Sequence, residues 1–149
     1  MKMRTIDNRL FFDEVAEQLT LGYTVRIRAR GNSMLPFIRD GRDVLVLEHP
    51  GERDFAQGEM LLTQLDDGRY VIHRLVKVKG DQLRLRGDGN LKIYETCSRA
   101  EVLARVTEVV RGRNIVQGSR RWNAYRFLWP SHPFLRRVGL AIYRRINKQ

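Results

Sequence analysis

Hydrophobic and polar residues alternate along much of the first 110 positions, and this alternation predicts short β strands. In residues 24–30 (TVRIRAR), apolar side chains occupy every second position and arginines stand between them, which is typical of a half-buried strand. Asp66-Asp67-Gly68 is a good hairpin turn between two further β-rich runs. Residues 102–110 fit a helical period as well, but their β-branched content favours a strand. The expected strands after the first are residues 44–47, 60–65, 69–79, 83–86 and 102–110.

Apolar residues with helical spacing precede this β-rich region. Near the N-terminus, Phe11, Val15 and Leu19 recur every four residues. Asp7 or Asn8 is the expected N-cap, and Gly22 stands where the helix should end. The body is therefore expected to be a mainly β, β-rich α+β domain over residues 1–117 that opens with a short helix.

Helical spacing returns in residues 118–149, which we interpret as an amphipathic helical tail. Pro130 and Pro133 separate a shorter aromatic segment from a final helix. Arginines occupy the arc of the final helix opposite its apolar stripe. The stripe is Phe134, Val138, Ile142 and Ile146.

The charge of the chain is concentrated in this tail. The 149 residues suit one hydrophobic core, and 42% apolar with 30% charged residues is typical of a folded globular protein. Of 28 lysines and arginines, ten lie in residues 111–149, where no acidic residue occurs, so the first 110 residues hold 18 basic against 17 acidic groups. The net charge of +11 therefore indicates an interaction tail on a nearly neutral body.

Three interpretations of the tail remain open. Trp122, Trp129 and Tyr143 beside arginines suit an interfacial anchor on an anionic membrane surface. Alternatively, the helix packs on the body and its arginines form a solvated face, or the tail binds an acidic partner. Nucleic acid is an unlikely partner, because no stacking platform of interleaved aromatics accompanies the arginines of the first strand.

Targeting signals and cofactor ligands are sparse. The N-terminus lacks the apolar core of a signal peptide, and no run approaches the roughly 20 apolar residues of a transmembrane helix. We therefore expect a cytoplasmic protein with peripheral membrane contact at most.

Cys97 is the single cysteine, so no internal disulfide forms, and three scattered histidines complete no ligand set. No metal or organic cofactor is expected.

Candidate chemistry is concentrated in residues 31–36 (GNSMLP). Ser33 follows a predicted strand in a Gly-Asn turn, where the backbone N–H groups of the loop formed by Asn32, Ser33 and Met34 could bind an oxyanion. His73 lies in an apolar strand, and residues 87–90 (GDGN) form a tight turn. Taken singly, such a serine is common in loops and such a histidine is more often structural.

Together, these motifs resemble the signal peptidase I family and its LexA-like relatives. The order Gly-x-Ser-Met-x-Pro, Val-Ile-His-Arg and Gly-Asp-Gly-Asn over residues 25–112 is similar to the endoplasmic-reticulum and archaeal branch, in which histidine replaces lysine as the general base. The resemblance implies a LexA/signal-peptidase-like β body with Ser33 as nucleophile and His73 as base. It places Asp88 in the Gly-Asp box as the third member of the site, with Glu95 as the alternative.

The expected function is therefore a serine endopeptidase that acts through a Ser-His dyad and an acyl-enzyme. A serine hydroxyl is a poor nucleophile until a base accepts its proton, and free histidine, with a pKa of about 6.5, is largely neutral at pH 7. We expect Ser33 and His73 within hydrogen-bond reach, about 2.6–3.2 Å. The resemblance implies a peptide or protein substrate, bound as an extended strand with small residues near the scissile bond. The alternative function is a non-catalytic binding module on the same fold.

Overall fold

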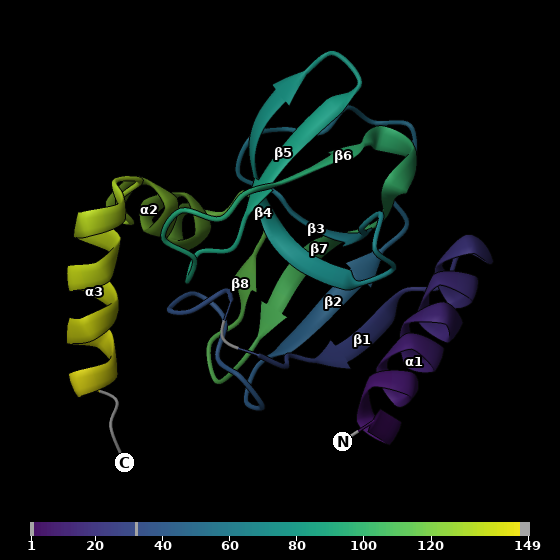
Figure 1. The fold of residues 1–149 in the computed structure, drawn as a ribbon, viewed down its shortest axis with the longest axis horizontal. Helices are drawn as coiled ribbons and strands as arrows, with labels where there is room; N and C mark the ends of the chain where they lie inside the picture. Colours follow the sequence, from purple (N-terminus) through teal and green to yellow (C-terminus); the bar gives the residue numbers. More distant parts are fainter. Residues whose placement is uncertain (1, 32, 147–149) are drawn as a thin grey trace.

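A curled, fully antiparallel sheet forms the body of the protein in the computed structural model (Figure 1), which describes residues 2–31 and 33–146 and side chains from Leu10 onward. Its strand order is β1-β2-β7-β3-β4-β5-β6, and β8 pairs with β7 outside this path. The strands are β1 (Val25–Arg28), β2 (Val44–Glu48), β3 (Met60–Gln64), β4 (Tyr70–Lys79), β5 (Gln82–Arg86), β6 (Glu95–Ser98), β7 (Val102–Val110) and β8 (Ile115–Val116). The helical elements are α1 (Lys2–Thr20), a short 3-10 helix (Arg99–Glu101), α2 (Arg120–Leu128) and α3 (Pro133–Ile146).

The long strand β7 joins the two halves of the sheet. Its first residues pair with β3, and Arg105 onward pairs with β2. Register irregularities interrupt the β2–β7, β3–β7 and β4–β5 pairs, and bulges of this kind bend strands and increase their twist. The β-rich α+β class expected from the sequence is confirmed.

Two apolar clusters lie on opposite faces of the curled sheet. Leu61 and Leu62 are adjacent on β3 and both fully buried, yet Leu61 belongs to one cluster and Leu62 to the other. Successive side chains of a strand point to opposite faces, so one strand supplies both clusters. The strict alternation of residues 24–30 therefore does not extend to the central strand β3, which is buried on both faces.

Helix α1 packs on the sheet through a face that differs slightly from the predicted one. Val15 and Leu19 are buried as expected, but Phe11 is exposed and Phe12 stacks on Tyr70 with ring centroids 5.1 Å apart. The helix also begins at Lys2, so Asp7 and Asn8 lie inside it and the predicted N-cap is wrong. Its predicted end is correct, because Gly22 has a φ of +91°, a left-handed conformation that favours glycine.

The strands β6 and β8 have no clear signal in the sequence. They hold four and two residues, and the segment 95–98 (ETCS) lacks an alternating apolar pattern. Both form by pairing with an existing neighbour, β5 and β7 respectively. Short strands depend on such pairing more than on their own residues.

Helix α2 belongs to the body rather than to a separate tail. Trp122 is buried in the larger cluster, packs edge-to-face on Phe37, and donates its Nε1–H to the carbonyl of Gly58. A boundary at residue 117 therefore cuts through a packed core. The predicted interfacial roles of Trp122 and Trp129 are also wrong, since Trp129 donates its Nε1–H inward to the carbonyl of Asp88.

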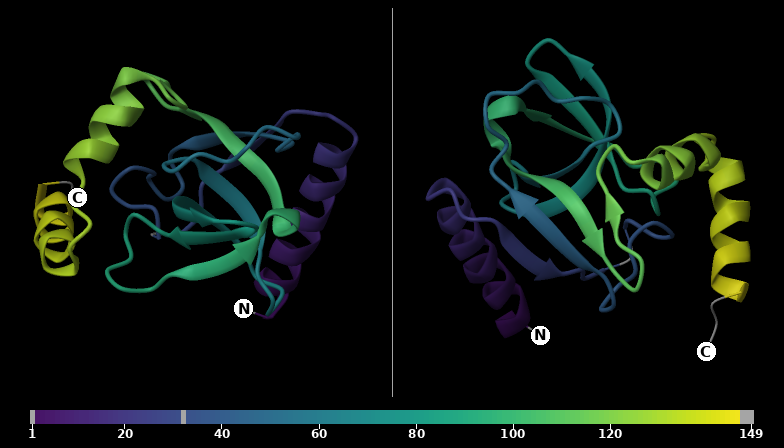
Figure 2. Two further views of the ribbon diagram at one scale, coloured as in Figure 1. Left: turned by 90° about the horizontal axis from the view of Figure 1, so that it is seen from above. Right: turned by 180° about the vertical axis from the view of Figure 1, so that it is seen from behind.

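Helix α3 stands at the opposite side of the body from α1 (Figures 1 and 2). Arg136 and Leu140 are buried on its inner side, and the apolar stripe predicted from the sequence faces away from the body. None of the described helices combines the length and apolar character needed to cross a bilayer.

Cys97 provides a simple test of the smaller cluster. The thiol is buried, and burial is the main cause that raises its pKa to about 11. We expect thiol reagents at pH 8 to leave the native protein unmodified, because the thiolate is the reactive form, and to modify Cys97 once denaturant is added. Mass spectrometry measures the adduct, and rapid modification without denaturant would contradict the described packing.

Candidate active site

The Ser33 loop begins where β1 ends and is tied at both of its ends. The Ala29 N–H donates to the carbonyl of Asp43, and the Gly41 N–H donates to the carbonyl of Ala29. Gly31 has a φ of +87°, and its N–H donates to Asp40 Oδ1 at 2.8 Å. Asp40 and Asp43 therefore close the loop that carries Ser33.

Asp43 is the internal anion of this loop. Its carboxylate is fully buried and accepts bonds from the Arg39 side chain and from Arg111 Nη2, at 2.7 and 2.6 Å. The bond to Asp43 raises the pKa of Arg39, whereas burial lowers that of Arg111. Because Arg111 also donates to the carbonyl of Phe37, the end of β7 is fastened to the loop.

Ser33 itself is half-buried, and the residues after it enter the core. Met34, Phe37 and Ile38 are buried, so the backbone leaving Ser33 is held by packing. Within the described residues, the backbone N–H groups of Ser33 and Met34 have no acceptor. Asn32, the other residue predicted for the oxyanion loop, lies outside the described residues.

His73 is held from behind by Glu95. The imidazole is buried on β4, and its Nδ1 lies 2.5 Å from Glu95 Oε1 at the start of β6. The strand β5 pairs with β4 only from Arg74 onward, so the segment that leads into β6 passes beside His73. Geometry thus selects Glu95, the alternative, as the carboxylate that contacts the base.

Ser33 and His73 line one cavity of about 630 Å³. Within the described part of the chain, no hydrogen bond joins Ser33 to His73, and Nε2 of the imidazole has no partner. The wall is mainly apolar and comes from α1, β1 and β4. It includes Phe11, Phe12, Ile27, Ser33, Ile72 and His73.

Two unpaired strand edges border this cavity. β1 is the edge strand of the sheet and pairs only with β2. The first part of β4, Tyr70 to His73, pairs with β3 on one side, and no described strand pairs with its other side. Exposed backbone N–H and C=O groups of this kind can pair with an extended peptide.

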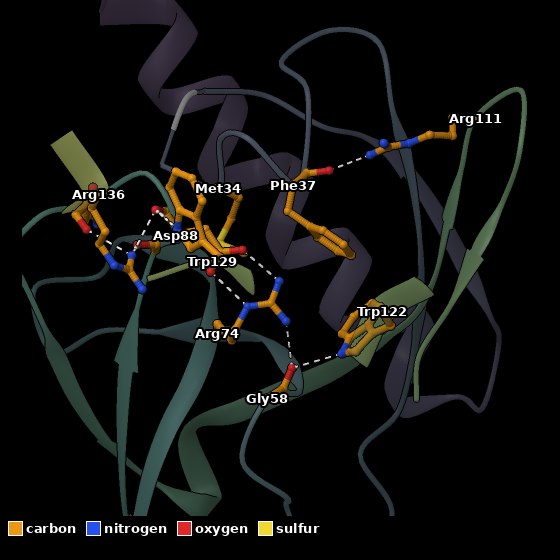
Figure 3. A network of polar contacts seen from close by, with 11 residues as sticks. Met34, Phe37, Gly58, Arg74, Asp88, Arg111, Trp122, Trp129 and Arg136 are labelled. Carbon is orange, nitrogen blue, oxygen red and sulfur yellow. Dashed lines mark hydrogen bonds and ion pairs between the residues drawn. The ribbon is translucent and has the colours of Figure 1, made fainter. Parts of the chain in front are cut away.

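Asp88 has a structural position instead of the predicted place beside His73. Its two carboxylate oxygens accept bonds from Arg74 Nε and Nη2 at 2.8 and 2.7 Å, and both side chains are buried (Figure 3). Arg74 also donates to the carbonyl of Gly58 and lies over the Phe37 ring at 4.9 Å. Both carboxylate oxygens of Asp88 are therefore occupied by Arg74, and neither contacts His73.

The Gly87–Asn90 turn carries Asp88 and supports Ser33 directly. The Gly89 N–H donates to the carbonyl of Ser33 at 2.7 Å. A Cβ added at Gly87 would lie 2.3 Å from the same carbonyl oxygen, so only glycine fits there. The turn thus fixes the backbone of the candidate nucleophile.

Arg136 of α3 binds the other side of the same turn (Figure 3). Its Nη1 lies 3.2, 2.9 and 3.1 Å from the carbonyl oxygens of Gly87, Asp88 and Asn90. Burial lowers the pKa of this guanidinium, and Arg86 adds a smaller repulsion. Helical spacing placed Arg136 on the arc opposite the apolar stripe, but spacing alone could not show that this arc faces the body at Arg136.

Arg74 was also missed as a functional residue, although it follows His73 in the motif. The signal that could have identified it is strand alternation, which directs neighbouring residues to opposite faces.

Among residues 2–31 and 33–146, no group of three His, Cys, Asp or Glu side chains could hold a metal ion.

Comparison with known proteins identifies one family. Residues 7–106, two thirds of the chain, match the family described as Peptidase S24-like. No curated protein matches the chain. The match includes Ser33, His73, Asp88 and Glu95 and ends before α2 and α3.

Replacing Gly87 with alanine tests the support of Ser33. The new Cβ would overlap the Ser33 carbonyl, so we expect Gly87→Ala to lower the free energy of unfolding by about 1–3 kcal/mol and to speed amide exchange at residues 33 and 34. Urea unfolding and hydrogen exchange measure the two effects. Gly112→Ala is the control, because a Cβ there meets open space. Equal stability of the two variants would contradict the contact.

Replacing Asp88 with asparagine tests the buried ion pair. Asp88→Asn leaves the Arg74 charge buried without its counter-ion, and we expect a loss of about 3–5 kcal/mol in the free energy of unfolding. Asp67→Asn breaks an exposed pair with Arg69 and should change stability little. A small effect of Asp88→Asn would show that the pair does not hold the site together.

Proposed function

Because the chain belongs to the peptidase S24-like family, we propose that it is a serine endopeptidase in which Ser33 is the nucleophile, His73 the general base and Glu95 the residue that orients the base. The observation that carries the proposal is the contact between His73 and Glu95 in the cavity that Ser33 also lines. A histidine in the base position resembles the endoplasmic-reticulum and archaeal signal peptidases.

The contact with Glu95 determines which imidazole nitrogen can act as the base. An ionised carboxylate only accepts hydrogen bonds, so Nδ1 carries the proton and Nε2 keeps its lone pair. Nε2 is then the atom that receives the Ser33 proton. When the imidazole becomes charged, the Glu95 carboxylate stabilises it in a buried setting.

The reaction follows from these positions. As Ser33 Oγ attacks the scissile carbonyl, its proton passes to Nε2, and the carbonyl oxygen becomes an oxyanion. The free backbone N–H groups of Ser33 and Met34 are the donors proposed for that oxyanion. The imidazolium then protonates the leaving amine, and water repeats the sequence to hydrolyse the acyl-enzyme.

The two unpaired edges suggest how a substrate would bind. We propose that an extended peptide pairs with β1 or with the first part of β4, so that its carbonyl reaches Ser33. The apolar cavity wall favours uncharged side chains near the scissile bond, and the family resemblance implies small ones. Arg26, Arg28 and Arg30 also line the cavity and would favour acidic residues farther along the peptide.

The proposal is tested by digesting a mixed peptide library and identifying new termini by mass spectrometry, with a fluorophosphonate probe to label a reactive serine. Ser33→Ala, His73→Ala and the double variant should each lose about 10³-fold or more and show strongly non-additive losses, because the two residues act as one unit. Glu95→Gln should lose about 10²–10⁴-fold, because an amide does not enforce the correct tautomer.

Matched controls are available in the same chain. Ser131→Ala and His49→Ala replace exposed residues and should leave activity unchanged. Cleavage that survives Ser33→Ala, or wild-type protein that neither cleaves peptides nor takes up the probe, would favour the alternative of a non-catalytic binding module.

A further inference from the structure

The inner and outer sides of α3 differ sharply in what they contact. Arg136 and Leu140 are buried, and Gly139 lies against Trp129, where an added Cβ would meet the indole at 2.8 Å. At about 100° per residue, the apolar side chains on the other side fall within an arc of about 120°. These residues, which we call the outer face of α3, are Phe134, Leu135, Val138, Ile142 and Ile146, and they are 41–76% exposed.

The end of α2 exposes two further apolar side chains. Phe127 and Leu128 end α2 and are 89% and 76% exposed. Figures 1 and 2 show α3 projecting along one side of the body, with α1 on the opposite side. An exposed apolar surface of this size marks an interaction site.

Basic side chains border the outer face and also interrupt it. At about 100° per residue, Arg137 and Arg144 lie beside its arc, whereas Arg145 lies within it. All three are exposed, and none of them forms an ion pair with any residue that the structure describes. No acidic residue occurs after Glu108 to neutralise them. The family match also ends at residue 106, so this segment is an addition to the part shared with the family.

We propose that the outer face of α3 lies in the surface of an anionic lipid bilayer. The apolar side chains would enter the boundary between headgroups and acyl chains, and the arginines would contact the lipid phosphates. Fourteen residues make a helix of about 21 Å, shorter than the roughly 30 Å hydrocarbon core, so the helix lies along the surface rather than across it.

Charge favours a bilayer over other occupants. A second copy packed on the same face would bring two sets of unpaired arginines together, which is unfavourable. A nucleic acid would pair with the arginines but leave the apolar residues in water. An anionic bilayer satisfies both groups at once.

The buried side of α3 transmits this docking to the body. Arg136 attaches the helix to the Gly87–Asn90 turn, so a docked helix holds the body at a fixed orientation on the bilayer. The cavity that Ser33 and His73 line is bordered by α1, which lies on the opposite side of the body from α3. A bilayer bound to the outer face of α3 would therefore leave this cavity open. The proposal does not depend on peptidase activity.

Co-sedimentation with vesicles tests the proposal. The full chain should bind phosphatidylcholine vesicles that contain phosphatidylglycerol, bind phosphatidylcholine alone at least about tenfold more weakly, and dissociate in high salt. Val138→Ser with Ile142→Ser, and separately Arg137→Gln with Arg144→Gln, should each weaken binding about tenfold or more. The matched controls are Leu21→Ser with Val116→Ser, and Lys77→Gln with Lys79→Gln, which alter exposed residues elsewhere.

A fluorescent label distinguishes insertion from loose electrostatic contact. Ile142→Cys can be labelled selectively with an environment-sensitive dye, because the native Cys97 is buried. The dye at position 142 should shift to the blue on anionic vesicles and be quenched by brominated lipid, whereas a dye at Lys79→Cys should not respond.

Three results would overturn the proposal. The first is vesicle binding that is absent, or that is unchanged by the two serine substitutions, which would show that the apolar face does not enter the bilayer. The second is a dye at position 142 that stays in water. The third is a stable dimer in sedimentation experiments that Val138→Ser with Ile142→Ser converts to a monomer, which would assign the face to a second copy.

Discussion

The buried pair of Arg74 and Asp88 is the interaction on which the arrangement of the site depends. One largely buried guanidinium joins the Asp88 carboxylate, the Gly58 carbonyl and the face of Phe37. Such a pair adds little net stability compared with apolar residues, but loss of one partner is costly. Its two parallel hydrogen bonds hold the turn that carries Asp88 against β4.

The alternation of side chains along β4 places the Arg74–Asp88 pair and the cavity on opposite faces of the strand. His73 and Arg74 are adjacent on β4, so one side chain points to the cavity and the other to the framework. The turn bound by Arg74 supports the Ser33 carbonyl, and the strand that carries Arg74 also carries His73, the proposed base. The two consecutive residues His73 and Arg74 therefore connect the proposed base to the turn that supports the candidate nucleophile.

Local sequence patterns predicted the strands that depend mainly on neighbouring residues. They did not predict the contacts between residues that lie far apart in the chain. The strand β1 follows from strict alternation, and β2, β3, β4, β5 and β7 follow from β-rich runs bounded by turn residues or from β-branched content. The choice between Asp88 and Glu95 could not be made in this way, since it depends on which carboxylate the 87–94 segment brings to β4. Likewise, Trp122 beside arginines suggested an interfacial position, and only its contacts with Phe37 and Gly58 place it in the core.

The arginines of the chain have two different roles, depending on whether they are buried or exposed. Arg74, Arg105 and Arg136 are internal and bind carboxylates or carbonyl oxygens, so they belong to the framework despite their contribution to the net charge. Arg137 and Arg144 lie on the same helix as Arg136 but remain exposed. A guanidinium on a three-carbon stem suits both settings, because it donates several hydrogen bonds when buried and keeps its charge when exposed. In α3, therefore, one arginine attaches the helix to the Gly87–Asn90 turn, while its neighbours Arg137 and Arg144 keep their charge at the surface.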